Sequence, residues 1–171
     1  SNQVIAMDSE DSKNFCFLVP MEYIFEDFTF GFISDKWPSL NIKSQSTDYL
    51  ATNKGSQVFQ IRNDIYINNQ LIIDTKYKIR GTDDGLKAGV SQTDLYQMVS
   101  YAIRRNCKNV LLLYPNTQKA LNTPALFQIP SAMLAEKLNI HVQNIDITFD
   151  DIHEADELMK GRVKQLNTIF Q

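Results

Sequence analysis

The stretch "SQVFQIRNDIYINNQLIIDTKYK", residues 56–78, decides the fold. Apolar residues fall at odd positions on both sides of "NNQ", which predicts two strands joined by a hairpin turn. The residues expected to share one face are Ile61, Ile65, Ile67, Leu71 and Ile73. Burying them together requires odd positions to pair with odd positions, which excludes a two-residue loop. A three-residue loop at 68–70 is therefore predicted, with paired residue numbers that sum to 138.

This register puts Asp64 directly opposite Asp74, with Lys76 on the same face two residues along. Like charges at cross-strand distance destabilise a sheet unless a cation or a shared proton lies between them. Two carboxylates with water and carbonyl oxygens suit Mg²⁺, and a metal beside a lysine suits phosphodiester hydrolysis. The alternative is that Asp74 and Lys76 form an ordinary surface ion pair, a common feature that carries no function.

Upstream, "VPMEYIFEDFTFGFIS" places Pro20 at the start of a predicted helix. Its apolar stripe comprises Met21, Ile24, Phe25, Phe28 and Phe32. Glu22, Glu26 and Thr29 are expected on another face.

Downstream, "TDLYQMVSYAIRRN", residues 93–106, predicts a second helix capped by Ser91 or Thr93. The stripe expected to be buried is Leu95, Met98, Val99 and Ala102. A second face carries Asp94, Gln97, Tyr101 and either Arg104 or Arg105.

The remaining segments complete an α/β domain. Strands are predicted at "LNIKSQ" (40–45), "NVLLLYP" (109–115), "ALFQIP" (125–130) and "NIHVQNIDI" (139–147), and a long amphipathic helix from about Asp150. The order of elements predicts a mixed β-sheet flanked by helices. Residues 1–14 are expected to form a loose leader, whose opening "SNQ" resembles a cloning remnant, and residues 15–171 a single domain.

Composition limits the classes of function. The 171 residues are 43% hydrophobic and 22% charged, as in an ordinary globular domain. No apolar run reaches the length of a membrane span and no signal peptide is evident, so a cytoplasmic protein is expected. The net charge of −3 has the wrong sign for tight binding of nucleic acid by this chain alone. No GxxxxGK[ST] motif occurs, which excludes a P-loop nucleotide site in this chain.

Five segments then occur in a familiar order: "FEDF" at 25–28, "RNDIYI" at 62–67, "IIDTKYK" at 72–78, "DLYQMVSYA" at 94–102 and "LLLYP" at 111–115. Together they resemble the PD-(D/E)XK nuclease superfamily, whose core is that of restriction endonucleases. More closely they resemble the McrC family, the nuclease subunits of McrBC modification-dependent restriction systems. The resemblance covers roughly residues 20–130 and depends on the order and spacing of the segments rather than on any one of them.

The resemblance implies roles for particular residues. Asp64 and Asp74 match the metal-binding aspartates and Lys76 the catalytic lysine, while Thr75 stands where a backbone carbonyl commonly completes the metal shell. Glu26 matches an acidic residue of the first helix, with Glu22 as its rival. Gln97 and Tyr101 match a Q-x-x-x-Y signature that lies near the site, although an exposed helix face would show the same spacing. Asn63 departs from the proline usual before the first aspartate.

The resemblance also implies cofactors and partners: Mg²⁺, with Mn²⁺ as a substitute, double-stranded methylated DNA, and a GTP-hydrolysing AAA+ subunit of McrB type. Basic residues that could form a lip for the DNA backbone are Lys78, Arg80, Arg104 and Arg105, together with Lys76, Lys87 and Lys108. The hypothesis is a Mg²⁺-dependent endodeoxyribonuclease of a 5-methylcytosine restriction system. Its alternatives are another nuclease of the superfamily, in DNA repair or CRISPR-type processing, and a non-catalytic scaffold of the same fold.

Overall fold

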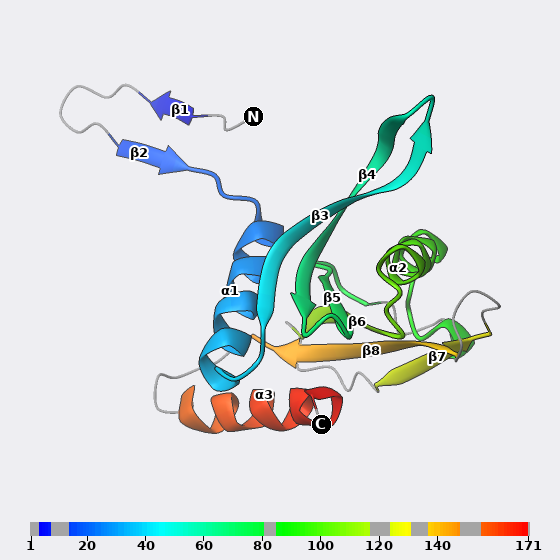
Figure 1. Cartoon of the computed structure of the whole chain (residues 1–171). Coiled ribbons are helices and arrows are strands. Elements are labelled where there is room, and N and C mark those ends of the chain that lie inside the picture. Colours follow the sequence, from blue (N-terminus) through cyan, green and yellow to red (C-terminus); the bar gives the residue numbers. More distant parts are fainter. Residues whose placement is uncertain are drawn as a thin grey trace.

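A computed structural model describes residues 4–7, 14–80, 85–116, 124–130, 137–147 and 155–170. Its main body is a six-stranded sheet in the order β3-β4-β5-β6-β8-β7, with helices packed on its faces (Figure 1). The strands of this sheet are β3 (Ile42–Asn53), β4 (Ser56–Ile67), β5 (Leu71–Thr75), β6 (Asn109–Asn116), β7 (Ala125–Ile129) and β8 (Leu138–Asp146). The helices are α1 (Met21–Lys36), α2 (Gln92–Arg105), α3 (Ala155–Phe170) and the 3₁₀ turn η1 (Gly85–Lys87).

The sheet is mixed, as predicted. The β3–β4 and β4–β5 pairs are antiparallel, the β5–β6 and β6–β8 pairs are parallel, and β7 closes the other edge antiparallel to β8. Each face carries its own apolar cluster. One cluster includes Met98 and Ala102 of α2, and the other includes Phe25 of α1 and Leu166 of α3. The predicted α/β fold is therefore confirmed.

The hairpin between β4 and β5 has the predicted register. Ile65 pairs with Ile73 and Ile67 with Leu71, so the paired numbers sum to 138 and the loop has three residues. Asn68 and Asn69 adopt φ values of 51° and 58° in this loop, a region that asparagine tolerates better than most residues. The hydrophobic pattern was therefore sufficient to position Asp64 and Asp74 relative to each other.

One part of that prediction is wrong. Ile61 packs in the α2 cluster, whereas Ile65 and Ile67 pack in the cluster on the opposite face. The β3–β4 ladder skips the position where Gln45 faces Asp64, and Gln45 has φ 47°. The distortion changes which residues of β4 face α2, so one alternation pattern does not run through the whole strand.

Helix α1 begins after Pro20, as predicted, but its buried face is rotated from the expected stripe. Met21 and Ile24 are each 44% exposed, whereas Glu26 and Thr29 are buried beside Phe25, Phe32 and Ile33. The aromatic chain at the end of the helix explains the orientation, because Phe32 contacts Trp37 and Trp37 contacts Phe170 of α3, with ring centroids 6.1 and 4.6 Å apart. These contacts turn Glu26 inward.

The amino-terminal residues include two short strands, β1 (Val4–Met7) and β2 (Asn14–Phe17), which pair antiparallel. The other leader residues, and Asp150 at the expected start of the last helix, lie outside the described residues. Within the described ranges, no helix is long and apolar enough to cross a membrane.

Candidate active site

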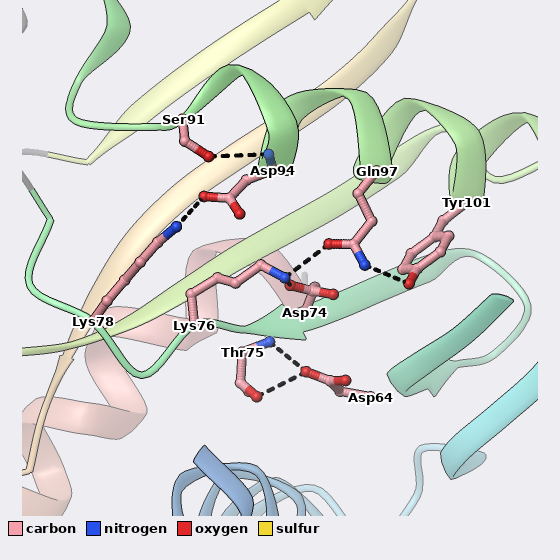
Figure 2. A network of polar contacts seen from close by, with 9 residues as sticks. All are labelled: Asp64, Asp74, Thr75, Lys76, Lys78, Ser91, Asp94, Gln97 and Tyr101. Atoms are coloured by element: carbon pink, nitrogen blue, oxygen red, sulfur yellow. Dashed lines mark hydrogen bonds and ion pairs between the residues drawn. The ribbon is translucent and has the colours of Figure 1, made fainter. Parts of the chain in front are cut away.

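The candidate site lies at the carboxyl end of β5, where β4 parts from it and α2 passes over the sheet (Figure 2). The ladder of β4 and β5 ends at Ile65 and Ile73. Strand β5 continues beside β6, and the Lys76 amide still donates a hydrogen bond to the Leu113 carbonyl at 2.9 Å. The divergence places Asp64, Asp74 and Lys76 together at this edge, as predicted.

Asp74 is the most buried of the acidic residues at the site, with 2% exposure. Its Oδ2 lies 2.7 Å from Lys76 Nζ, but the angles are not those of a hydrogen bond, so this buried oxygen keeps unused capacity as an acceptor. Burial, together with the neighbouring Asp64 and opposed by Lys76, raises the pKa of Asp74 to about 7. The cost of an ionised Asp74 therefore exceeds what Lys76 alone offsets.

Helix α2 fixes Lys76 through a chain of side chains. Lys76 Nζ donates to Gln97 Oε1 at 2.9 Å, and Gln97 Nε2 donates to the Tyr101 hydroxyl at 2.7 Å. Burial would lower the pKa of Lys76, but Asp74, Asp94 and Asp64 outweigh it and raise that pKa. Lys76 is therefore a fixed cation at neutral pH, suited to offset negative charge rather than to accept a proton.

Asp64 is held by the residue that follows Asp74. Its Oδ2 accepts hydrogen bonds from the Thr75 amide at 2.7 Å and from the Thr75 hydroxyl at 2.8 Å. These two hydrogen bonds connect β4 to β5 beyond the last ladder pair, Ile65 with Ile73. In this structure Thr75 thus orients Asp64 through its amide and hydroxyl. The role of its carbonyl as a metal ligand stays a prediction.

Glu26 adds a third carboxylate, which is close enough to Asp64 for electrostatic repulsion between them. It is 7% exposed, and burial followed by Asp64 raises its pKa, while a hydrogen bond from Gln45 opposes the shift. Its rival Glu22 is exposed. Of the two glutamates, Glu26 is the one that α1 turns toward the site.

Asp94 was not among the residues singled out for the site. It is 7% exposed on the first turn of α2, and Lys78 Nζ lies 2.5 Å from its Oδ2. Burial raises the pKa of Asp94, but Lys78 and Ser91 outweigh this and lower it. The Ser91 hydroxyl accepts from the Asp94 amide at 3.1 Å, and this Ser-x-x-Asp spacing is a capping signal that was available in the sequence.

The predicted basic lip needs correction. Arg80 is only 4% exposed. Arg105 donates to Asn63 Oδ1, Ser46 Oγ and the Thr47 carbonyl, with only 15% of its side chain exposed. Arg104 donates to the Asp48 carboxylate and the Tyr49 carbonyl. Both arginines of α2 therefore brace the β3–β4 hairpin, because these partners lie on it or at its base.

The donor set fits a hard divalent cation. Among the described residues no three His, Cys, Asp or Glu side chains gather closely enough to hold a metal by themselves. Two carboxylates with waters and a carbonyl are, however, the usual protein contribution to a Mg²⁺ site. The buried Asp74 oxygen without a hydrogen bond, and the raised pKa beside Asp64, both indicate an excess of negative charge that a cation would relieve.

Comparisons with known proteins agree on one system. A family model described as "McrBC 5-methylcytosine restriction system component" matches residues 1–115. A solved structure of Thermococcus gammatolerans, described as a half-complex from a tetradecameric assembly of McrB AAA+ hexamers with bound McrC, contains a chain that superposes with a TM-score of 0.65 at 20% identity. The match covers 91% of this chain and 34% of the other, so this chain spans about a third of its length. No curated protein sequence matches.

Proposed function

The chain belongs to the McrBC family of 5-methylcytosine restriction system components, and from this membership we propose that it is the metal-dependent DNA endonuclease domain of an McrC-type subunit. The observation that carries the proposal is the convergence of Asp64, buried Asp74 and Lys76 at one sheet edge. A non-catalytic scaffold has no need of a buried carboxylate whose ionisation is this costly.

The residues divide the work of hydrolysis among them. Asp64 and Asp74, with the Thr75 carbonyl, would hold Mg²⁺. When bound, the ion supplies Lewis-acid polarisation of the phosphate and lowers the pKa of water. Lys76 places a positive charge beside Asp74, where it offsets negative charge on the phosphate as the water oxygen bonds to phosphorus and the P–O bond to the leaving group breaks. Gln97 and Tyr101 hold the Lys76 ammonium in place.

The substrate and partner follow from the family. We propose 5-methylcytosine-containing duplex DNA as substrate and a GTP-hydrolysing AAA+ subunit of McrB type as partner. The absence of a P-loop motif in this chain supports that division, because nucleotide hydrolysis then falls to another subunit. The net charge of −3 supports it too, because an acidic chain needs help to retain DNA.

The test combines metal binding with cleavage. Titration with Mn²⁺ by calorimetry should show binding to the wild type and to Asp27→Asn, an exposed carboxylate on α1, but not to Asp74→Asn. Cleavage of methylated duplex, with the McrB-type partner, GTP and Mg²⁺, should be lost in Asp64→Asn and Asp74→Asn. Retained cleavage by Asp74→Asn would contradict the proposal. Equal cleavage of methylated and unmethylated duplex would favour a nuclease of a different system.

A further inference from the structure

The β3–β4 hairpin extends beyond the sheet as an arm, residues 46–63 (Figure 1). Every residue from 50 to 57 is exposed, so neither face of the outer arm packs against the described protein. The turn is a tight one at Lys54 and Gly55, whose φ values are 50° and 82°. Two-stranded hairpins are marginally stable by themselves, which makes a long solvated arm an unusual structure to keep without a partner.

The middle of the arm carries an apolar pair at a strained position. Phe59 is 73% exposed and has φ 57°, which is rare for a bulky residue. It faces Leu50, which is 43% exposed, and the β3–β4 ladder skips this pair. Such strain persists where the surrounding structure imposes it and is concentrated at functional positions. The exposed Phe59 ring buries little area within the described fold, so packing does not offset the strain of its backbone. We therefore read this pair as a surface for contact with another molecule.

The base of the arm is continuous with the candidate site. Asp64 is the residue that follows the arm on β4, and Gln45 opposite it precedes the arm on β3. Arg104 and Arg105 hold the inner half of the arm against α2. A substrate whose phosphate reaches Asp64 therefore lies beside the braced arm.

The charges favour nucleic acid over protein as the occupant. The arm and its base, residues 43–66, and the two bracing arginines carry five basic side chains and two acidic ones: Lys43, Lys54, Arg62, Arg104, Arg105, Asp48 and Asp64. The whole chain has a net charge of −3, so this positive region stands against an acidic remainder. We propose, on the basis of the proposed nuclease function, that the arm lies in the minor groove of duplex DNA beside the cleaved phosphate, with Phe59 and Leu50 wedged against the base steps.

The test measures binding of a fluorescein-labelled duplex by anisotropy at low salt, with EDTA present so that no cleavage occurs. Phe59→Asn should weaken binding about tenfold, because asparagine suits the positive φ but lacks the ring. Phe59→Tyr should bind like the wild type. Leu126→Asn, a half-exposed leucine on β7 at the other edge of the sheet, is the matched control and should bind normally.

A second set of variants tests the charges. Lys54→Asn, which keeps a favourable turn residue, and Arg62→Ala should each reduce the slope of log affinity against log salt by about one. Lys164→Ala on α3 should leave the slope unchanged. The proposal is overturned if the wild type binds no duplex at any salt or if all arm variants bind duplex normally. It is also overturned if Phe59→Asn still binds duplex normally but no longer binds the AAA+ partner. Loss of cleavage in Asp74→Asn is independent of these results, so the nuclease assignment and the arm can fail separately.

Discussion

Asp74 carries the strongest electrostatic conflict of the candidate site, because a single ammonium must balance a carboxylate that is buried beside another carboxylate. Sequence register was enough to find this residue. The pairing of β4 with β5 depends on neighbouring residues and a three-residue loop, so the pattern of isoleucines encodes it locally. The burial of Arg80 and Arg105 depends on packing between distant segments, so their basic character alone gave a wrong expectation of exposure.

The unfavourable burial of the Asp74 carboxylate predicts that the neutral variant Asp74→Asn gains stability over the wild type, by an amount that depends on pH. The pKa of Asp74 rises from 3.8 to about 7, so the metal-free wild type loses stability as pH increases between these values. Asp74→Asn has no such loss. Its melting temperature, without metal, should match or fall below the wild type near about pH 5 and exceed it by about 2 °C or more near pH 8. Asp27→Asn is the control; a pH-independent difference in Asp74→Asn would contradict the burial of a strained charge.

Gln97 predicts a separation of catalysis from metal binding. Its amide orients Lys76 and is not in hydrogen-bond contact with Asp64 or Asp74. Gln97→Leu should therefore reduce the rate of cleavage about 10- to 100-fold and leave Mn²⁺ affinity unchanged. Gln92→Leu is the matched control, because Gln92 donates to Tyr96 with the same spacing on the exposed part of the same helix. Equal loss in both variants would mean that helix stability, not the position of Lys76, limits the rate.

At the scale of elements, the hairpin and α2 were predicted well and α1 less well. Apolar periodicity locates a helix, but it cannot distinguish an apolar residue that packs inside from one that stays exposed, such as Met21 or Ile24. The orientation of α1 follows from Trp37 and Phe170, which lie outside the helix. The change of face within β4, where Ile61 packs on the side of the sheet opposite to Ile65, was likewise missed. It coincides with the positive φ of Gln45 on β3, and a glutamine in the sequence gives no signal of such a φ.

The bracing of the arm predicts unequal roles for two adjacent arginines. Arg105 makes three hydrogen bonds and stacks over Tyr66 at 5.3 Å, with little exposure, whereas Arg104 has 41% of its side chain exposed. Arg105→Ala should lower the free energy of unfolding by about 2 kcal/mol, because it leaves the side-chain oxygen of the buried Asn63 without its donor. Arg104→Ala should cost under about 1 kcal/mol. Urea unfolding measures both, and equal values would contradict a specific role for Arg105.

At the scale of the whole molecule, the sheet, its two apolar clusters and the site form one unit, in which β4, β5 and α2 bring the acidic residues and Lys76 together. The chain covers about a third of the matched chain, and its candidate site lies at the base of the β3–β4 arm. In the proposed nuclease, the fold supplies the reacting groups, whereas the net charge of −3 opposes the approach of DNA. Substrate capture and chemistry should therefore respond differently to conditions.

Salt separates these two steps. Cleavage of duplex by this chain without an McrB-type partner should show KM rising steeply with salt, since the proposed DNA-binding arm would be its main attraction for phosphates, while kcat stays nearly constant. The Mn²⁺ affinity should fall much less than DNA affinity over the same range, because Asp74 is buried and screening acts weakly there. Steady-state cleavage and Mn²⁺ calorimetry at matched salt concentrations measure both quantities. If kcat and Mn²⁺ affinity fall together with salt, the ions act on the site itself and capture by the arm is not the limiting step.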